Sequence, residues 1–455
     1  MKKSSTKNQD LTASFCQCEE YKDSLLYIKN FSRFCLYQKD THYYKLFSYD
    51  DMEQAVYNHL KLYADKNITL GICKDIVMQI KFECYKRVNN FQSMYISLID
   101  KLLNTRTNEF EDFDPNKYSF ISVPITSEDV ANSTGDAPPL FQKFLDEVLV
   151  NKDLTPDVGM QLLMQETFGY CLLPGTEAEA CFFFIGDGAN GKSKLLDILK
   201  AMVGIENCGS SSIERLTNSN FATSGLIGKR INVCTEESSE FVKQDKFKAL
   251  ISGESVDIEK KFQDGFSEVL PVKYLFATNE MPSFSGLNKA FTRRINLLYF
   301  LRTFEVNERD PQIANKIIEA ELPQIYLWAL KGARRLIESS MRFTIPPSVA
   351  ERAIEFENSL SSAVSYMREK YEVCDDFFQS NVALYEDYKD VWCDLVGKKP
   401  MGRDKFFKQI NNILKFKSVV KRVDGKVERG YQLKLKEDEL EDAIKTLNDQ
   451  LNIIF

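Results

Sequence analysis

The sequence predicts an α/β fold for the central part of the chain, with a mainly helical region before it and a helix-and-hairpin region after it. Three observations lead to this prediction. From Gly169 to Pro346-Pro347, strand-like apolar runs alternate with turns and helical stretches. A glycine-rich loop joins one of these runs to a helix. Near the C-terminus, helical stretches precede two strand-like runs that flank Asp424-Gly425, a hairpin turn signal.

Length and composition indicate several ordinary globular domains. The chain has 455 residues, of which 44% are hydrophobic and 27% charged, so disorder and fibrous repeats are disfavoured. The stretch from Ala131 to Pro139 is rich in Asn, Ser, Gly and Pro and is the best linker. We therefore predict a mainly helical N-terminal domain over residues 1–135, a central domain over 136–345 and a C-terminal domain over 346–455.

Cysteine, histidine and apolar patterns exclude several classes of protein. The 11 cysteines are scattered and odd in number, which favours reduced thiols over a disulfide framework. With only 2 histidines and no C-x-x-C pair, a structural zinc site lacks ligands. No apolar run is long enough to span a membrane, and the first residues are polar. We expect a soluble, cytoplasmic protein.

The N-terminal region shows helical apolar spacing from about Leu25 to Val88, interrupted by two short strand-like runs, Phe34 to Tyr37 and Tyr43 to Phe47. An acidic cluster follows at Glu111, Asp112 and Asp114. Such a cluster could hold the metals of a primase, but no second group of carboxylates is evident. We do not expect an active site there.

The strongest motif is the loop that follows the apolar run Cys181 to Ile185. It matches G-x-x-x-x-G-K-[ST] in the strand, loop and helix context that a phosphate-binding loop requires. Its backbone N–H groups should face phosphate, Lys192 should reach the β- and γ-phosphates, and the Ser193 hydroxyl should bind Mg²⁺. The expected contacts to ATP come from Gly186, Asp187, Gly188, Ala189, Asn190, Gly191, Lys192, Ser193 and Lys194.

Polar residues follow two further strand-like runs. Arg230 to Cys234 leads to Glu236, a candidate Mg²⁺ ligand, and to Glu237, a candidate base for the attacking water. Val272 to Thr278 leads to Asn279, whose amide could bind the γ-phosphate or that water. The alternative is a solvated acidic loop.

A pair of arginines, Arg293 and Arg294, follows Asn279 along the chain. By itself the pair could be a surface ion-pair site. Together with the three elements upstream of it, the pair favours an arginine finger, with Arg294 as the catalytic residue and Arg293 as a nucleotide contact.

These motifs resemble the superfamily 3 helicases, particularly the helicase part of phage, plasmid and poxvirus-type primase-helicases. The resemblance covers roughly Phe141 to Phe300, and its order and spacing are specific. The motifs that carry it lie at residues 168–170, 186–193, 228–230, 248–254, 277–282 and 293–294.

The resemblance implies a P-loop NTPase of AAA+ type, assembled as a homo-hexameric ring with ATP bound between subunits and single-stranded DNA in a central channel. Lys248 corresponds to a basic residue that reaches a neighbour's nucleotide. Residues 256–266 resemble a DNA-gripping hairpin with Lys260, Lys261 and Phe262 as contacts. Two residues depart from the family pattern: Glu236 stands where many motor ATPases have Asp, and Gln263 stands where the hairpin tip is often basic.

The formal charge of −7 hides a basic C-terminal segment. From Lys398 to Lys436 there are 13 Lys or Arg and 3 acids, a net +10 that leaves −17 for the rest of the chain. With helices followed by a hairpin, this segment predicts a winged helix that binds duplex DNA. The expected contacts are Arg403, Lys405, Lys408, Lys421, Arg422 and Lys426. The alternative is a basic domain that only packs on the ring.

The combined expectation is an ATP-dependent, Mg²⁺-requiring DNA helicase that unwinds DNA for replication of a phage, plasmid or other mobile element. A separate primase or other replication proteins are candidate partners. The alternative from another class is an origin-binding initiator that uses ATP as an assembly switch without unwinding. A small-molecule kinase would leave the hairpin lysines and the basic segment without a role.

Overall fold

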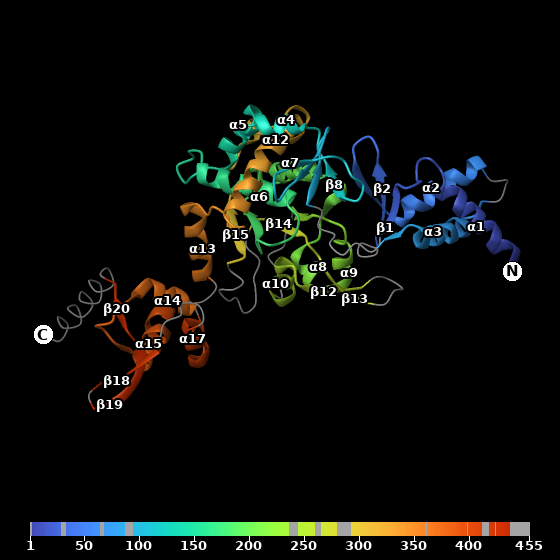
Figure 1. Cartoon of the computed structure of the whole chain (residues 1–455). Helices are drawn as coiled ribbons and strands as arrows, with labels where there is room; N and C mark the ends of the chain where they lie inside the picture. Colours follow the sequence, from blue (N-terminus) through green and yellow to red (C-terminus); the bar gives the residue numbers. More distant parts are fainter. Residues whose placement is uncertain are drawn as a thin grey trace. The chain divides into compact units, whose positions relative to one another are not determined.

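The computed structural model (Figure 1) describes residues 2–28, 33–63, 68–86, 94–235, 244–259, 265–279, 293–359, 362–397, 399–411, 418–423 and 425–436. The chain divides into two compact units. The first comprises Met1–Ser285 and Asn296–Pro347, and the second comprises Gly286–Ile295 and Ser348–Phe455. No helix in the described ranges has both the length and the apolar character that a membrane crossing needs. All 11 cysteines are free thiols.

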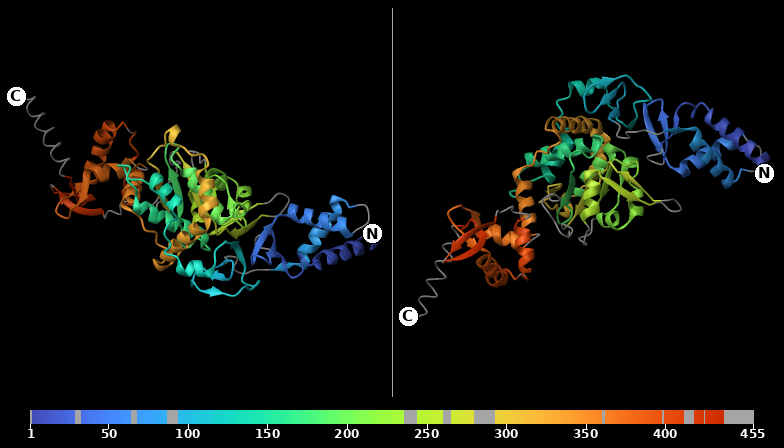
Figure 2. Two further views of the ribbon diagram at one scale, coloured as in Figure 1. Left: turned by 90° about the horizontal axis from the view of Figure 1, so that it is seen from above. Right: turned by 60° about the horizontal axis from the view of Figure 1, so that its bottom comes forward.

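The N-terminal part of the first unit is a layer of helices on a sheet. Its helices are α1 (Lys2–Cys16), α2 (Tyr49–Tyr63) and α3 (Leu70–Glu83), which lie together in Figure 2. The sheet has the order β3-β2-β1-β4, formed by β1 (Leu25–Ile28), β2 (Arg33–Gln38), β3 (Tyr43–Phe47) and β4 (Tyr85–Lys86). Alternate residues serve different cores: Tyr27 and Phe34 pack with the helices, whereas Ile28 and Cys35 pack with Phe120.

A second small sheet follows, with the order β7-β6-β5-β8. Its strands are β5 (Tyr95–Ser97), β6 (Leu102–Asn104), β7 (Phe110–Glu111) and β8 (Ser119–Ser122), and α4 (Ser127–Asn132) comes after them. Strands β2 and β3 match the strand-like runs at residues 34–37 and 43–47, and β5, β6 and β8 overlap strand-like runs that the sequence also shows at residues 95–103 and 118–123. The region therefore holds more sheet than the description as mainly helical conveys.

The acidic cluster of this region is held by neighbouring groups. The Asp112 carboxylate lies 2.6 Å from the Lys101 ammonium, Glu111 pairs with Lys117, and Asp114 accepts a 2.8 Å hydrogen bond from the Asn116 N–H. These contacts lower the pKa of all three carboxyl groups. The described part of the chain contains no group of three or more acidic, His or Cys residues that could hold a metal.

The centre of the first unit is a five-stranded sheet with the order β10-β11-β14-β9-β15. The strands are β9 (Cys181–Ile185), β10 (Cys208–Gly209), β11 (Ile231–Cys234), β14 (Lys273–Thr278) and β15 (Ile295–Tyr299). The pairs β10–β11, β11–β14 and β14–β9 are parallel. The predicted strands at residues 181–185, 230–234 and 272–278 are confirmed to within one residue, because fully buried parallel strands read as continuous apolar runs.

Helices cover this sheet, and the longest of them joins several parts of the unit. These helices are α5 (Pro139–Val148), α6 (Val158–Leu172), α7 (Lys192–Val203), α8 (Ile213–Asn218), α9 (Asn220–Ser224), α10 (Gln244–Ser252) and α12 (Ile313–Glu338), with 3₁₀ turns at Ile205–Asn207 and Val306–Glu308. The Glu321 carboxylate of α12 accepts hydrogen bonds from the N–H groups of Leu140 and Phe141, at 2.9 and 2.8 Å. These donors are otherwise unpaired at a helix start, so α12 fixes the beginning of α5.

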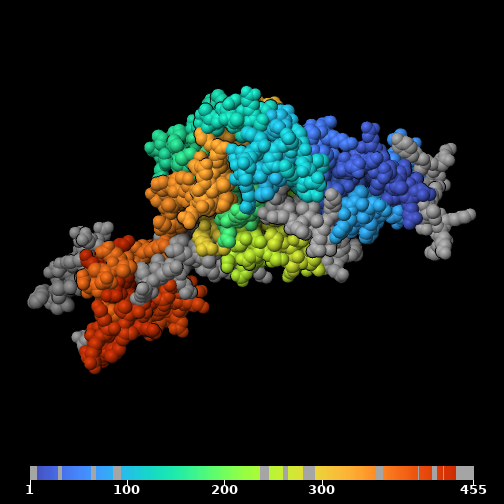
Figure 3. Space-filling view, in the orientation of Figure 1, coloured from blue at the N-terminus to red at the C-terminus, as the bar shows by residue number. Residues whose placement is uncertain are grey.

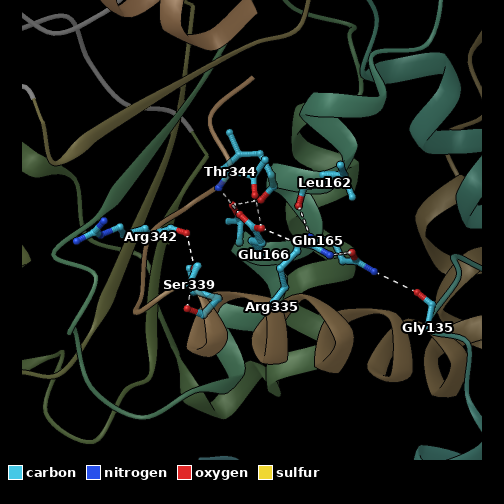
Figure 4. A network of polar contacts seen from close by, with 11 residues as sticks. Gly135, Leu162, Gln165, Glu166, Arg335, Ser339, Arg342 and Thr344 are labelled. Atoms are coloured by element: carbon cyan, nitrogen blue, oxygen red, sulfur yellow. Dashed lines mark hydrogen bonds and ion pairs between the residues drawn. The ribbon is translucent and has the colours of Figure 1, made fainter. Parts of the chain in front are cut away.

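Helices α6 and α12 approach each other closely because glycines lie at their contact. A Cβ on Gly169 would lie 2.2 Å from the Ala333 nitrogen, and one on Gly332 would lie 2.1 Å from the Gln165 carbonyl oxygen. Beside this contact, the fully buried Glu166 carboxylate accepts from the Arg335 Nε at 2.6 Å and from the Thr344 N–H at 2.7 Å (Figure 4). Glu166 on α6 thus binds both Arg335 on α12 and Thr344 in the segment that follows α12.

Replacing Gly169 with Ala should lower the free energy of unfolding by about 1–3 kcal/mol, because the added methyl group overlaps backbone that cannot rotate away. Gly225→Ala is the matched control: Gly225 has φ −68°, and its nearest neighbour would be 3.4 Å away. We expect the control to be neutral or slightly stabilising. Urea unfolding of the three proteins measures both effects, and equal midpoints would contradict the close contact of α6 and α12.

Two basic side chains, the buried Lys273 and the half-buried Arg230, lie at the end of helix α6, on the side of the sheet opposite its carboxyl edge. Lys273, the first residue of β14 and 1% exposed, donates to the Leu173 carbonyl, and its ammonium lies 5.4 Å from the Tyr170 ring centre. The Arg230 Nη1 donates to the Leu172 carbonyl at 2.7 Å. Burial lowers the pKa of Lys273 to about 7 and that of Arg230 to about 10. The two side chains satisfy carbonyl groups that a helix end leaves unpaired.

The contribution of Lys273 to stability should therefore rise with pH from about 7 to about 10. Over this interval the unfolded chain keeps a proton on Lys273, whose unfolded pKa is about 10.4, and the folded chain has lost it. A folded-state pKa below the unfolded one for a cationic group means that raising the pH favours the folded state. The stability difference between the wild type and Lys273→Met, measured by urea unfolding at pH 7, 8 and 9, should grow in favour of the wild type. A constant difference would show that Lys273 titrates normally.

The hairpin predicted between β11 and β14 is present. Strands β12 (Ser255–Ile258) and β13 (Phe266–Val269) pair antiparallel from Ser255 with Val269 to Ile258 with Phe266. The hairpin lies at the surface of the first unit (Figure 3). Lys260, Lys261, Phe262 and Gln263 lie outside the described residues.

The second unit combines short helices with two small sheets. Its helices are α13 (Pro347–Ser359), α14 (Ser362–Lys370), α15 (Asn381–Glu386), α16 (Cys393–Leu395) and α17 (Arg403–Gln409), with a π-helical turn at Asp387–Trp392. Strands β17 (Gln379–Ser380), β19 (Lys426–Tyr431) and β18 (Ser418–Val423) form one sheet, and β16 (Tyr371–Val373) pairs with β20 (Leu433–Leu435). The predicted hairpin is confirmed as β18–β19. An aromatic core that includes Tyr366, Tyr388, Trp392 and Phe406 holds the helices together.

Candidate functional site

The carboxyl ends of three neighbouring strands meet at one edge of the central sheet. Parallel pairing places Thr278 opposite Ile185 and Cys234 opposite Phe276, so β9, β14 and β11 end side by side. A cavity of about 430 Å³ lies at this edge. It is lined by Gly188, Ala189, Asn190, Gly191, Lys192, Ser193, Lys194, Thr235, Ala277, Thr278 and Asn279. The structure thus brings the glycine-rich loop together with both predicted strand tips, as ligand sites of open α/β sheets require.

The loop turns sharply into helix α7. Gly188, Ala189 and Gly191 have φ values of 104°, 48° and 86°, a region that glycine adopts at little cost. A Cβ on Gly191 would also lie 2.5 Å from the Val148 side chain, so α5 packs directly on the loop. Helix α7 begins at Lys192 with no side-chain cap. Its first N–H groups and the positive end of its dipole therefore face the loop, an arrangement suited to an anion.

Two side chains in the loop fit a phosphate group. Lys192 is 6% exposed and donates to the Gly186 carbonyl, and burial lowers its pKa. Asn190 is 2% exposed, and its Nδ2 donor has no hydrogen-bond partner in the described structure. An unpaired buried donor costs about 1–3 kcal/mol. An oxygen-rich ligand in the adjoining cavity would remove that cost, so the residues present fit a polyphosphate.

Other predicted residues of the site are placed less completely. Asn279 and Ser193 line the cavity, as the resemblance implies, whereas Glu236 and Glu237 lie outside the described residues. Thr235, directly before the two glutamates, does line the cavity. Lys248 is half-buried on α10 and is not among the lining residues, and neither are Gly186 and Asp187.

The arginine pair precedes a strand whose other end reaches the loop. The Phe300 N–H donates to the Ile185 carbonyl at 2.8 Å, which places the end of β15 beside the start of the loop. Asn296, near the beginning of β15, donates to the carbonyl of Cys181 at the beginning of β9. Arg293 is exposed, and Arg294 is 6% exposed. The arginines thus come before the end of β15 that is remote from the loop.

The predicted DNA contacts of the second unit are solvent-exposed. Arg403, Lys405 and Lys408 lie on α17, which turns Phe406 into the aromatic core. Lys421, Arg422 and Lys426 lie on β18 and β19, and the Lys421 ammonium is 5.9 Å from the Phe378 ring centre. The sequence predicts the recognition helix over Arg403 to Leu414; the observed α17 ends at Gln409, and residues 412–414 lie outside the described residues.

Thr235, Ala277 and Thr278 line the cavity although sequence reasoning assigned them no role. Their positions at strand ends could have indicated this role from the sequence. Each is the last residue of a buried strand or its immediate neighbour, and the ends of parallel strands carry the ligand contacts of such sheets.

Comparison with known proteins gives a family match, a curated relative and solved structures. Residues 184–294 match a family described as "Family of unknown function (DUF5906)". The chain is 24% identical over 280 residues to the "Putative helicase L207/L206" of Acanthamoeba polyphaga mimivirus, an alignment that covers 58% of this chain and 27% of that protein. The chain thus spans about a quarter of the length of this relative.

Among solved structures, two apo forms of the C-terminal region of NrS-1 are similar to this chain. One has 13% identity and a TM-score of 0.44, and the other has 14% identity and a TM-score of 0.43. Each match covers 90% of this chain and 96% of the NrS-1 chain.

Proposed function

We propose that this chain is an ATP-dependent DNA helicase that acts as a hexamer in replication of a phage, plasmid or other mobile element. The observation that carries the proposal is the cavity where the glycine-rich loop meets the tips of β11 and β14, with Lys192 and the unpaired Asn190 donor beside it. The similarity to a mimivirus protein named as a helicase supports the same activity.

In this proposal, the triphosphate lies in the 430 Å³ cavity. The loop N–H groups, the start of α7 and the Lys192 ammonium hold its oxygens, and Asn190 donates a further hydrogen bond. When bound, Mg²⁺ supplies charge neutralisation at the β- and γ-phosphates, with the Ser193 hydroxyl and the Glu236 carboxylate as its ligands.

Hydrolysis needs an oriented water and a group that accepts its proton. Glu237, two residues after Thr235 in the lining of the cavity, is the proposed base, and the Asn279 amide at the tip of β14 orients the water or the γ-phosphate. The oxygen of the attacking water bonds to the γ-phosphorus while a water proton passes to the Glu237 carboxylate. The bond between the γ-phosphorus and the bridging oxygen breaks, and ADP and inorganic phosphate are released. Lys192 and the loop N–H groups stabilise the charge that the transition state spreads over the phosphate oxygens.

A ring accounts for the arginine pair. Strand β15 has 5 residues at about 3.3 Å each, so about 16 Å of strand separates the arginines from the end beside the chain's own loop. An arginine so placed serves a neighbour's nucleotide better than its own. Arg293 is exposed and can reach a neighbour, whereas Arg294 is 6% exposed and would have to be uncovered in the ring; Lys248 is a third candidate.

Two surfaces would bind DNA. The β12–β13 hairpin would carry Lys260, Lys261 and Phe262 into the channel of an AAA+ ring, and the second unit would bind duplex DNA as a winged helix through its exposed basic residues. The second candidate function is an origin-binding initiator that uses ATP only to assemble, which the exposed basic residues on α17 and on the β18–β19 hairpin would also serve.

Strand displacement on forked DNA with 5′ and 3′ single-stranded tails separates the two candidates. A helicase releases the labelled strand with ATP and Mg²⁺ and does not release it when ATP is omitted. DNA-stimulated hydrolysis without strand release would reject the helicase. ATP-dependent assembly on duplex DNA would then support the initiator.

A further inference from the structure

A second cavity, of about 540 Å³, adjoins the glycine-rich loop in the first unit. One wall is helix α5 and the other is the segment from Phe304 to Lys316, which leads into and begins α12. Its lining consists of Leu140, Lys143, Phe144, Glu147, Ala189, Gly191, Lys194, Phe304, Glu308, Arg309, Asp310, Pro311, Ile313 and Lys316. This volume falls within the ordinary range of small-molecule sites, about 300–1,000 Å³.

This cavity and the phosphate cavity share three residues, Ala189, Gly191 and Lys194. The backbone ties the two cavities together as well, because the Phe304 N–H donates to the Ala189 carbonyl at 2.9 Å. A ligand with its phosphates on the loop therefore has this cavity next to it. The two cavities together can accommodate one extended molecule with an anionic end and a second, different end.

The lining of the second cavity indicates what that second end is. Leu140, Phe304 and Ile313 remain partly exposed, and with Phe144 and Pro311 they make up its apolar lining. Such a surface favours the flat faces of an aromatic ring, which pack by dispersion and by removing apolar area from water.

The charged groups of the Phe304–Lys316 wall are already engaged within the chain. Asp310 pairs with Lys316 at 2.6 Å, and Glu308 pairs with Arg302 at 3.1 Å. The Arg309 Nε donates to the Phe304 carbonyl at 2.9 Å. These contacts fix the shape of the wall. Because its charged groups already have partners, its apolar side chains are the groups available to contact a ligand.

We propose that this cavity is the nucleobase site, with the base held by its faces between α5 and the Phe304–Ile313 wall while the triphosphate lies on the loop. The assignment rests on the proposed nucleotide-binding function and adds to it the residues that bind the base. The wall formed by α5 is positioned by Glu321, whose carboxylate caps that helix from α12.

The test compares ATP with inorganic tripolyphosphate, which has the anionic chain without a base or sugar. Binding of each to the full chain is measured by titration calorimetry for the wild type, Phe304→Ala and Ile313→Ala, two changes that remove apolar surface and add no charge beside the phosphate cavity. We expect each variant to lose about tenfold in affinity for ATP, in line with the contribution of one stacked base. Affinity for tripolyphosphate should stay unchanged, which also shows that the variant is folded.

Two substitutions serve as matched controls. Asn315→Ala changes an exposed residue of α12 two positions after Ile313, and Phe221→Ala removes an exposed phenylalanine of α9. Both should bind ATP and tripolyphosphate as the wild type does.

The possible results separate two failures. A wild type that binds neither ligand overturns the nucleotide site, and the base site with it. A wild type that binds both, with variants that keep full ATP affinity or lose both ligands equally, overturns the base site alone and leaves the phosphate site in place.

Discussion

ATP hydrolysis by the Lys192→Ala chain should fall about a hundredfold to a thousandfold, the loss typical when one preorganised donor to a transition-state oxygen is removed. Lys192 lines the cavity, and its ammonium donates a hydrogen bond to the Gly186 carbonyl. Its removal should therefore leave the fold intact. Phosphate release with saturating ATP and Mg²⁺ measures the effect, and thermal melting monitors folding.

Lys200→Ala is the matched control for this change. Lys200 lies on the same helix, eight residues after Lys192, and it pairs with Asp197 at 2.8 Å on the helix surface, outside the cavity lining. Its variant should hydrolyse ATP at the wild-type rate. A Lys192→Ala chain that retained full activity would place hydrolysis elsewhere and would remove the basis of the proposed function.

Duplex DNA affinity should fall steeply when Arg403, Lys405 and Lys408 are replaced together by alanine. These side chains are exposed on α17. Each lost phosphate contact should lower the slope of log affinity against log salt by about 0.9, so the slope should fall by roughly two to three. ATP hydrolysis without DNA should be unchanged. Fluorescence anisotropy with a labelled duplex at several salt concentrations measures both the affinity and its slope.

The control for the triple variant removes the same charge elsewhere. Lys22, Lys61 and Lys74 are exposed lysines of the N-terminal part of the first unit. Their joint replacement by alanine should leave the salt slope unchanged. Equal slopes for both triple variants would show that α17 contributes only general charge, and the winged-helix proposal would lose its support.

The central strands and the phosphate loop could be predicted because their signals are local. Cys181 to Ile185 is an uninterrupted apolar run, and the glycines that follow occupy backbone angles that other residues adopt at a cost. The hairpins β12–β13 and β18–β19 could be predicted for the same reason, since turn residues lie between short runs of strand-forming side chains.

The contacts that complete the site could not be predicted, because they join distant parts of the chain. Nothing near Leu140 indicates that Glu321 caps helix α5, and nothing near Phe304 indicates its hydrogen bond to Ala189. Gly169 was noted only as part of a motif. The structure supplies its physical reason, which is the close approach of the Ala333 backbone. The burial of Arg294 likewise depends on tertiary packing and not on the arginine pair itself.

Because Glu321 caps α5 from far along the chain, the site can be completed only late in the synthesis of the protein. A ribosome makes the chain from its N-terminus, and Leu140 emerges long before the helix that caps it, 181 residues later. The loop and the tip of β14 are complete once Asn279 has emerged, but both walls of the second cavity can be fixed only after Glu321. A nascent chain that ends between Asn279 and Glu321 would have the phosphate loop but would lack the cap that fixes α5, one wall of the second cavity. Contacts of such wide sequence separation also form slowly, because a long loop must close first, so the proposed nucleotide site would be complete only near the end of synthesis of the first unit.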